Sequence, residues 1–234
     1  MQIRIGRGSV QPRCGLLMST AAAATVGKVV ASALTYPIEN FRLIHVMPEK
    51  DKVRPTLRNL YRGYAGFVPY SLFNSLTTFN LMFGLQEYFR YLAPEAALLA
   101  SVAITVAVTS LYKVPCMYHI KNRAVHRDVE GRMASGVFGR AYSVLILEDV
   151  PEQFIKFHLN GVLAAMPEVS SVASAILVAV LTTLTTSPTD ILKQRVFCDL
   201  RVPLSSFGVF LRALASTVNT VVFMLVFNTM AAAA

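Results

Sequence analysis

Six long, largely apolar segments follow one another along the chain, separated by short polar stretches. Each segment has more than the roughly twenty residues that a helix needs to cross a bilayer. The pattern predicts helices over residues 19–47, 64–90, 94–123, 139–166, 167–198 and 207–230. We therefore expect an all-α membrane protein with six transmembrane helices.

Composition supports a membrane protein. Hydrophobic residues make up 54% of the chain and charged residues only 15%, whereas a soluble domain carries about 25% charged residues. The net charge of +9 comes from bases in the short segments between the apolar runs, as in membrane-protein loops. No basic run is long enough to indicate nucleic-acid binding. The spacings of Cys14, Cys116 and Cys198 indicate neither a metal site nor a disulfide. No catalytic motif is present, so we expect no enzyme, no catalytic residue and no metal ligand.

Three prolines recur at similar points of the apolar segments. Pro37, Pro115 and Pro188 are 78 and 73 residues apart, and such a period indicates repeats. A proline inside a helix removes one backbone hydrogen bond and kinks the helix. The spacing predicts three units, each a pair of helices whose first member is kinked by proline.

Charged residues follow two of these prolines at the same offsets. After Pro188 comes an acid two residues later, Asp190, and bases five and seven residues later, Lys193 and Arg195. After Pro37 the same acid and first base appear as Glu39 and Arg42. After Pro115 the acid position is Met117 and the base position is Ile120.

This repeated motif resembles the signature of the mitochondrial carrier family. The resemblance implies six transmembrane helices in three pseudo-symmetric two-helix repeats, multi-pass in the mitochondrial inner membrane. The repeats would cover residues 19–93, 94–166 and 167–234 as one domain, after a basic N-terminal segment, 1–18. That segment contains Arg4, Arg7 and Arg13 and no acid. It is either a targeting sequence or a basic arm on the membrane or a neighbour.

The resemblance also implies a matrix-side gate of salt bridges between the repeats. Asp190 is expected to pair with Arg42. Glu39 and Lys193 are expected to lack their partners, because Ile120 and Met117 occupy the partner positions. Lys121, one residue further on, could replace a missing base only after a change of register, since one residue turns a side chain by about 100°.

The opposite gate is reduced further. Glu87 and Arg90 are the acid and base expected in the first repeat. The corresponding stretches 157–161 and 227–231 contain neither. Only a remnant of this gate is expected.

Three charged residues, Glu148, Glu152 and Lys156, are spaced four apart and share one helix face. Charges at membrane depth face a cavity or a partner. One hypothesis is a binding site for a cationic solute. The favoured one is an internally paired set, Glu152 with Lys156, in a water-filled cavity or against another subunit. In the last apolar segment only Arg212 lies nearby.

Glycines mark the expected lipid sites. In the family, an aromatic residue, a base and a glycine precede each second helix and hold cardiolipin phosphates. Tyr61-Arg62-Gly63 matches fully, whereas Gly139 and Gly208 match in part. Bound cardiolipin is therefore the expected ligand and no other cofactor is expected, although each glycine is equally well explained by a tight turn.

Two functions follow from these observations. The reduced gates and shortened repeats favour a structural or accessory subunit of a large inner-membrane assembly, such as a respiratory complex or ATP synthase. Its partners would be the lipid bilayer and other subunits. The alternative is a working solute carrier that exchanges a small metabolite across the inner membrane.

Overall fold

The computed structural model describes residues 13–46, 54–124, 133–164, 166, 169–198 and 206–233, and in these ranges the chain is helical without strands. The prediction of an all-α protein is confirmed. The expected N-terminal segment lies mostly outside the described residues. The helices are α1 (Arg13–Val46), α2 (Leu57–Leu60), α3 (Tyr64–Tyr88), α4 (Pro94–Ala124), α5 (Ser135–Ala164), α6 (Ser171–Cys198) and α7 (Ser206–Ala233).

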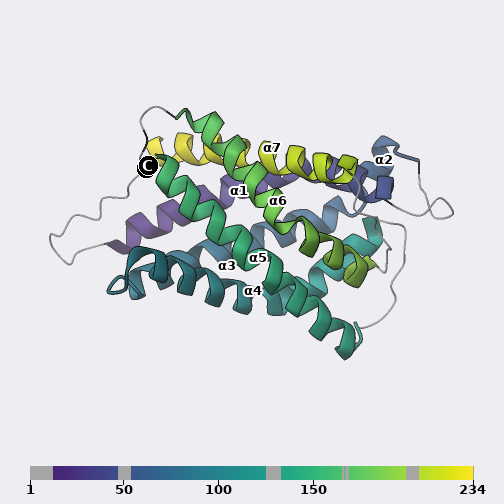
Figure 1. The fold of residues 1–234 in the computed structure, drawn as a ribbon, viewed down its shortest axis with the longest axis horizontal. Coiled ribbons are helices and arrows are strands. Elements are labelled where there is room, and N and C mark those ends of the chain that lie inside the picture. The colour runs from purple at the N-terminus through teal and green to yellow at the C-terminus, as the bar shows by residue number, and fades with distance from the viewer. Residues whose placement is uncertain are drawn as a thin grey trace.

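The long helices run roughly along the long axis of the molecule (Figure 1), and their packing closes them into a ring. Each long helix packs against the next one along the chain, and α7 packs against α1. The short α2 lies at one end of the molecule and the C-terminus at the other. The chain therefore builds three hairpins, α1–α3, α4–α5 and α6–α7, around a common interior.

Four of the described helices are long and apolar enough to cross a membrane. These spans are Ala21–His45, Pro94–Ala124, Val172–Cys198 and Phe207–Val226. The other two long helices, α3 and α5, have similar lengths. Five charged side chains lie in α5, whereas α3 contains only Glu87. The structure thus supports a multi-pass membrane protein.

The outer and inner surfaces of the ring have opposite characters. Large apolar side chains that are half or more exposed occur on all six long helices; examples are Leu34, Phe73, Leu111, Leu147, Leu184 and Phe210. The interior instead contains many buried serines and threonines. Several donate to a carbonyl one turn earlier in their own helix, as Thr109 does to Thr105 at 2.8 Å. Small side chains whose hydroxyl groups donate within their own helix let neighbouring helices approach closely without leaving unpaired polar groups.

The repeated prolines all lie inside helices, Pro37 in α1, Pro115 in α4 and Pro188 in α6. We call the end of the ring nearest these residues the proline end. The α1 helix ends there against the turn after α2. Tyr36 donates its hydroxyl to the Arg62 carbonyl at 2.6 Å, and Asn40 donates to the Leu60 carbonyl at 2.8 Å.

Gly63 makes this turn possible. Its φ of 84° lies in the left-handed region, which costs other residues about 1–2 kcal/mol. A Cβ at this position would also lie 2.8 Å from the Tyr36 hydroxyl oxygen. A side chain here would therefore meet both backbone strain and a steric clash.

The two other glycines of the expected lipid motif are placed differently. Gly139 lies inside α5, which begins at Ser135, and Gly208 lies inside the first turn of α7. Nothing lies within 4 Å of a Cβ built at Gly139. The prediction that Gly139 begins its helix is wrong, because the helix starts one turn earlier at a serine.

We predict that Gly63→Ala lowers the free energy of unfolding by about 1–2 kcal/mol because of the left-handed backbone. Thermal unfolding of the detergent-purified protein measures this change. Gly66→Ala is the matched control, since Gly66 lies in α3 with nothing within 4 Å of its Cβ position, and alanine favours a helix interior. Equal effects of the two substitutions would contradict the prediction.

Candidate functional site

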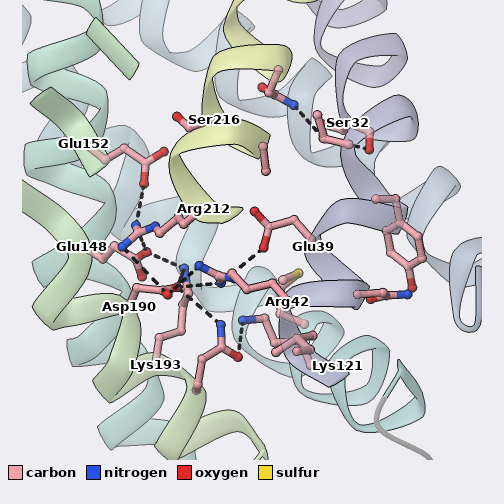
Figure 2. Close-up of a pocket in the computed structure, with 18 of the residues that line it drawn as sticks. Ser32, Glu39, Arg42, Lys121, Glu148, Glu152, Asp190, Lys193, Arg212 and Ser216 are labelled. Atoms are coloured by element: carbon pink, nitrogen blue, oxygen red, sulfur yellow. Dashed lines mark hydrogen bonds and ion pairs between the residues drawn. The ribbon is translucent and has the colours of Figure 1, made fainter. Parts of the chain in front are cut away.

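A polar cavity of about 270 Å³ lies inside the ring (Figure 2). Its lining comes from all six long helices, and it includes ten charged side chains. Ligand pockets usually measure several hundred Å³ and place a few polar groups around the ligand. The size suits a small metabolite, and polar groups converge on it from several helices.

Six charged residues cross-link four helices at the proline end of this cavity. We call this set the ionic layer; it comprises Glu39 and Arg42 of α1, Glu148 of α5, Asp190 and Lys193 of α6, and Arg212 of α7. Figure 2 shows these side chains pointing toward one another.

The pair that the resemblance implied lies in the centre of the layer. Arg42 donates to both carboxylate oxygens of Asp190, at 2.9 and 3.3 Å, and both side chains are about 90% buried. Asp190 also lies 3.4 Å from Lys193 and 3.9 Å from Arg212. Bidentate geometry of this kind gives strong charge-assisted hydrogen bonds.

The expectation that Lys193 lacks its acid is wrong. Lys193 lies 2.5 Å from a carboxylate oxygen of Glu148, which is fully buried. Arg212 donates to the same oxygen at 2.9 Å. The acid comes from α5 instead of the Met117 position of α4, because α5 neighbours α6 in the ring.

Arg212 takes part in the ionic layer, a role that the sequence analysis did not predict. Besides Glu148 it contacts Thr186, whose carbonyl and hydroxyl oxygens each accept from it at 2.8 Å. A signal was available, since Arg212 is the single base in the apolar run 207–230. A lone base at that depth needs an acid from another helix.

Glu39 and Lys121 do not meet. Glu39 lies 3.2 Å from Arg42 of its own helix. Lys121 donates to the amide oxygen of Gln194 at 3.3 Å and lies 5.6 Å from the centre of the Phe197 ring. The suggested replacement of the missing base by Lys121 is not made, because its side chain points toward α6.

The charged stripe of α5 is internally paired. Glu152 accepts from Lys156 at 2.5 Å and lies 3.9 Å from Arg212. A further ion pair, between Lys113 and Asp149, joins α4 to α5. Glu148 and Glu152 therefore both have counter-charges within the protein, which agrees with the interpretation of a paired set in a cavity.

An apolar cluster lies toward the opposite end of the ring. The set that we call the apolar layer comprises Ala21 and Ala24 of α1, Phe79 and Met82 of α3, and Val102 and Val106 of α4. Phe79 also stacks on Phe223 of α7, with ring centres 5.9 Å apart. Since α1 lies between α3 and α7 in the ring, this aromatic contact joins two helices that are not neighbours in the ring.

Glu87 and Arg90 of the expected second gate lie at the end of α3. They are 2.8 Å apart, three residues apart along the chain, and the Arg90 side chain is 68% exposed. This contact is a surface ion pair within one segment. The apolar layer joins α1, α3 and α4 at this end.

No protein-family model matches this chain, and no curated protein is significantly similar to it.

We predict that Arg42 and Asp190 are strongly coupled. The test is a double-mutant cycle with Arg42→Gln and Asp190→Asn. Each single substitution leaves the other charge buried without its counter-charge, which lowers the free energy of unfolding by about 3–5 kcal/mol. The double variant should recover at least about 1 kcal/mol of that combined loss.

The control cycle uses Glu87→Gln and Arg90→Gln, whose coupling should fall below about 1 kcal/mol because the pair is exposed. Thermal unfolding in detergent provides both measurements. Additive effects of the Arg42 and Asp190 substitutions would contradict a coupled pair.

Proposed function

We propose that this chain is a solute carrier of the mitochondrial inner membrane, built as six membrane-spanning helices in three repeats. The observation that carries the proposal is the polar cavity between the ionic layer and the apolar layer. A carrier needs a central site with convergent polar groups, and a separable contact at each end of that site.

The ionic layer supplies the contact at one end of the central site. Reduced gates favoured a structural subunit when only the sequence was considered. The contacts of Glu148 with Lys193 and Arg212 supply ion pairs that the motif positions lack. Because each hydrogen bond to a charged group contributes about 1.5–3 kcal/mol, this layer can hold one end of the ring closed.

The apolar layer supplies the contact at the other end of the central site. Packing of Phe79, Met82 and Phe223 can close the opposite end without charged residues. Two conformations can interconvert when their free energies differ by only a few kcal/mol. Ion pairs at one end and apolar contacts at the other can balance in this way, so the missing acids and bases at stretches 157–161 and 227–231 are compatible with transport.

Transport can be tested in proteoliposomes that contain the purified full chain. The assay measures uptake from a panel of radiolabelled phosphates, carboxylates, amino acids and polyamines. We expect uptake of at least one solute above empty liposomes. Glu148→Gln should slow it about tenfold, the effect of losing about 1.4 kcal/mol of charge-assisted contact.

Arg140→Gln is the control, because Arg140 is an exposed base on the same helix. Folded protein that transports none of these solutes would contradict the proposal. Equal rates for Glu148→Gln and the unchanged chain would contradict the role of the ionic layer.

A second candidate is the structural subunit of a respiratory complex or ATP synthase. The observation that favours it is the second gate, because stretches 157–161 and 227–231 of the later repeats lack its acid and its base. Gentle extraction of mitochondrial membranes and native gel separation test it. Stoichiometric migration with a large complex after stringent washing would support this role, and migration as a small monomer would oppose it.

Cardiolipin is the lipid that we propose for the turn at Gly63. Thr56, Arg58, Asn59 and Arg62 line a surface pocket beside this turn. Basic and amide side chains of this kind suit a phosphate headgroup.

A further inference from the structure

We propose that the solute of this cavity is a small anion, a phosphate or carboxylate, and that Lys28 and Lys121 supply its positive contacts. This inference rests on the proposed carrier function and names the class of its substrate. It replaces the cationic solute that the acids of α5 suggested.

The charge of the cavity wall supports an anion. Among the described lining residues, six are bases and four are acids, which leaves an excess of two positive charges. The bases are Lys28, Arg42, Lys121, Lys156, Lys193 and Arg212, and the acids are Glu39, Glu148, Glu152 and Asp190.

All four acids already have basic partners. Glu39 and Asp190 contact Arg42, Glu148 contacts Lys193, and Glu152 contacts Lys156, each at 3.2 Å or less. One carboxylate oxygen of Glu148 accepts no hydrogen bond, but a cationic solute there would compete with Lys193 and Arg212 for the same carboxylate. It would also add to a charge that is already in excess.

Two bases are left with neutral partners. Lys28 donates to the amide oxygen of Asn219 at 2.8 Å, and Lys121 donates to that of Gln194 at 3.3 Å. Among the described side chains, neither has a carboxylate within 4 Å. Lys121 is 92% buried, and an ammonium group in such a position is costly without a counter-charge. An anion in the cavity would supply that charge.

The two lysines lie at different depths. Lys28 precedes Arg42 by fourteen residues on α1, which is about 20 Å along a helix, and it lies one turn beyond Ala24 of the apolar layer. Lys121 lies at the proline end, beside the ionic layer. Ser32 and Ser216 line the side of the cavity away from Lys121 (Figure 2). The two lysines therefore mark two positions along the cavity, one near each layer, and a small anion contacts one of them at a time.

Ligand-induced thermal stabilisation of the full chain in neutral detergent tests this proposal. The probes are inorganic phosphate, malonate, citrate and spermidine, compared at constant ionic strength. We expect at least one anion, but not spermidine, to raise the unfolding temperature. The phosphate and carboxylate arms show which anion class is preferred. At least one of Lys28→Gln and Lys121→Gln should weaken the binding of the stabilising anion about tenfold, through loss of one charge-assisted contact.

Two further variants separate a cavity effect from a surface effect or misfolding. Arg123→Gln removes an exposed base from the same helix as Lys121 and should leave anion affinity unchanged. Lys121→Arg keeps the charge and should retain binding. If Lys121→Gln does not fold, Lys28→Gln and Lys121→Arg decide the outcome.

The possible results separate this inference from the carrier function. Anion binding that depends on Lys28, without uptake by liposomes, would uphold the anion site and overturn the carrier. Uptake of polyamines without anion binding would uphold the carrier and overturn the anion site. Stabilisation by spermidine alone, or equal loss of anion binding in Arg123→Gln and Lys121→Gln, would also overturn the anion site.

Discussion

Charged side chains at membrane depth cannot face lipid, and this constraint sets the rotation of the helices in the ring. The candidate span Ala21–His45 contains Lys28, Glu39 and Arg42, and the exposed positions of this span include Leu34. Exposing a charge to hydrocarbon costs several kcal/mol. The charged face of α1 therefore points inward, and the same argument applies to α6 and α7.

Asp190 is the residue on which the inward charges converge. It contacts bases from α1, α6 and α7, while Glu148 contributes from α5. A strictly threefold arrangement would need an acid at Met117 of α4. The ring satisfies Lys193 instead with an acid from the neighbouring helix. The network is therefore asymmetric. Each base pairs with the nearest acid that faces the interior, and that acid need not occupy the equivalent position of another repeat.

The two ends of the cavity are joined by different forces. Ion pairs at the proline end depend on geometry, and breaking one leaves two buried charges. The aromatic and aliphatic contacts of the apolar layer are less directional, because apolar attraction follows buried area. Movement at the apolar end therefore leaves no unpaired charge behind. This difference suits a protein in which one end opens more readily than the other.

The sequence by itself determined the helices and the contacts that depend on local spacing. The apolar segments predicted the ends of the six long helices to within six residues. An offset of four residues correctly placed Glu152 beside Lys156. The Arg42–Asp190 pair was expected from the family resemblance that the repeated motif carries. Only the tertiary structure decided that Glu148 joins Lys193 to Arg212, that Lys121 turns toward Gln194, and that the cavity has a positive excess. The physical reason is that helical periodicity is a local property, whereas pairing between helices depends on their order in the ring and on their rotation.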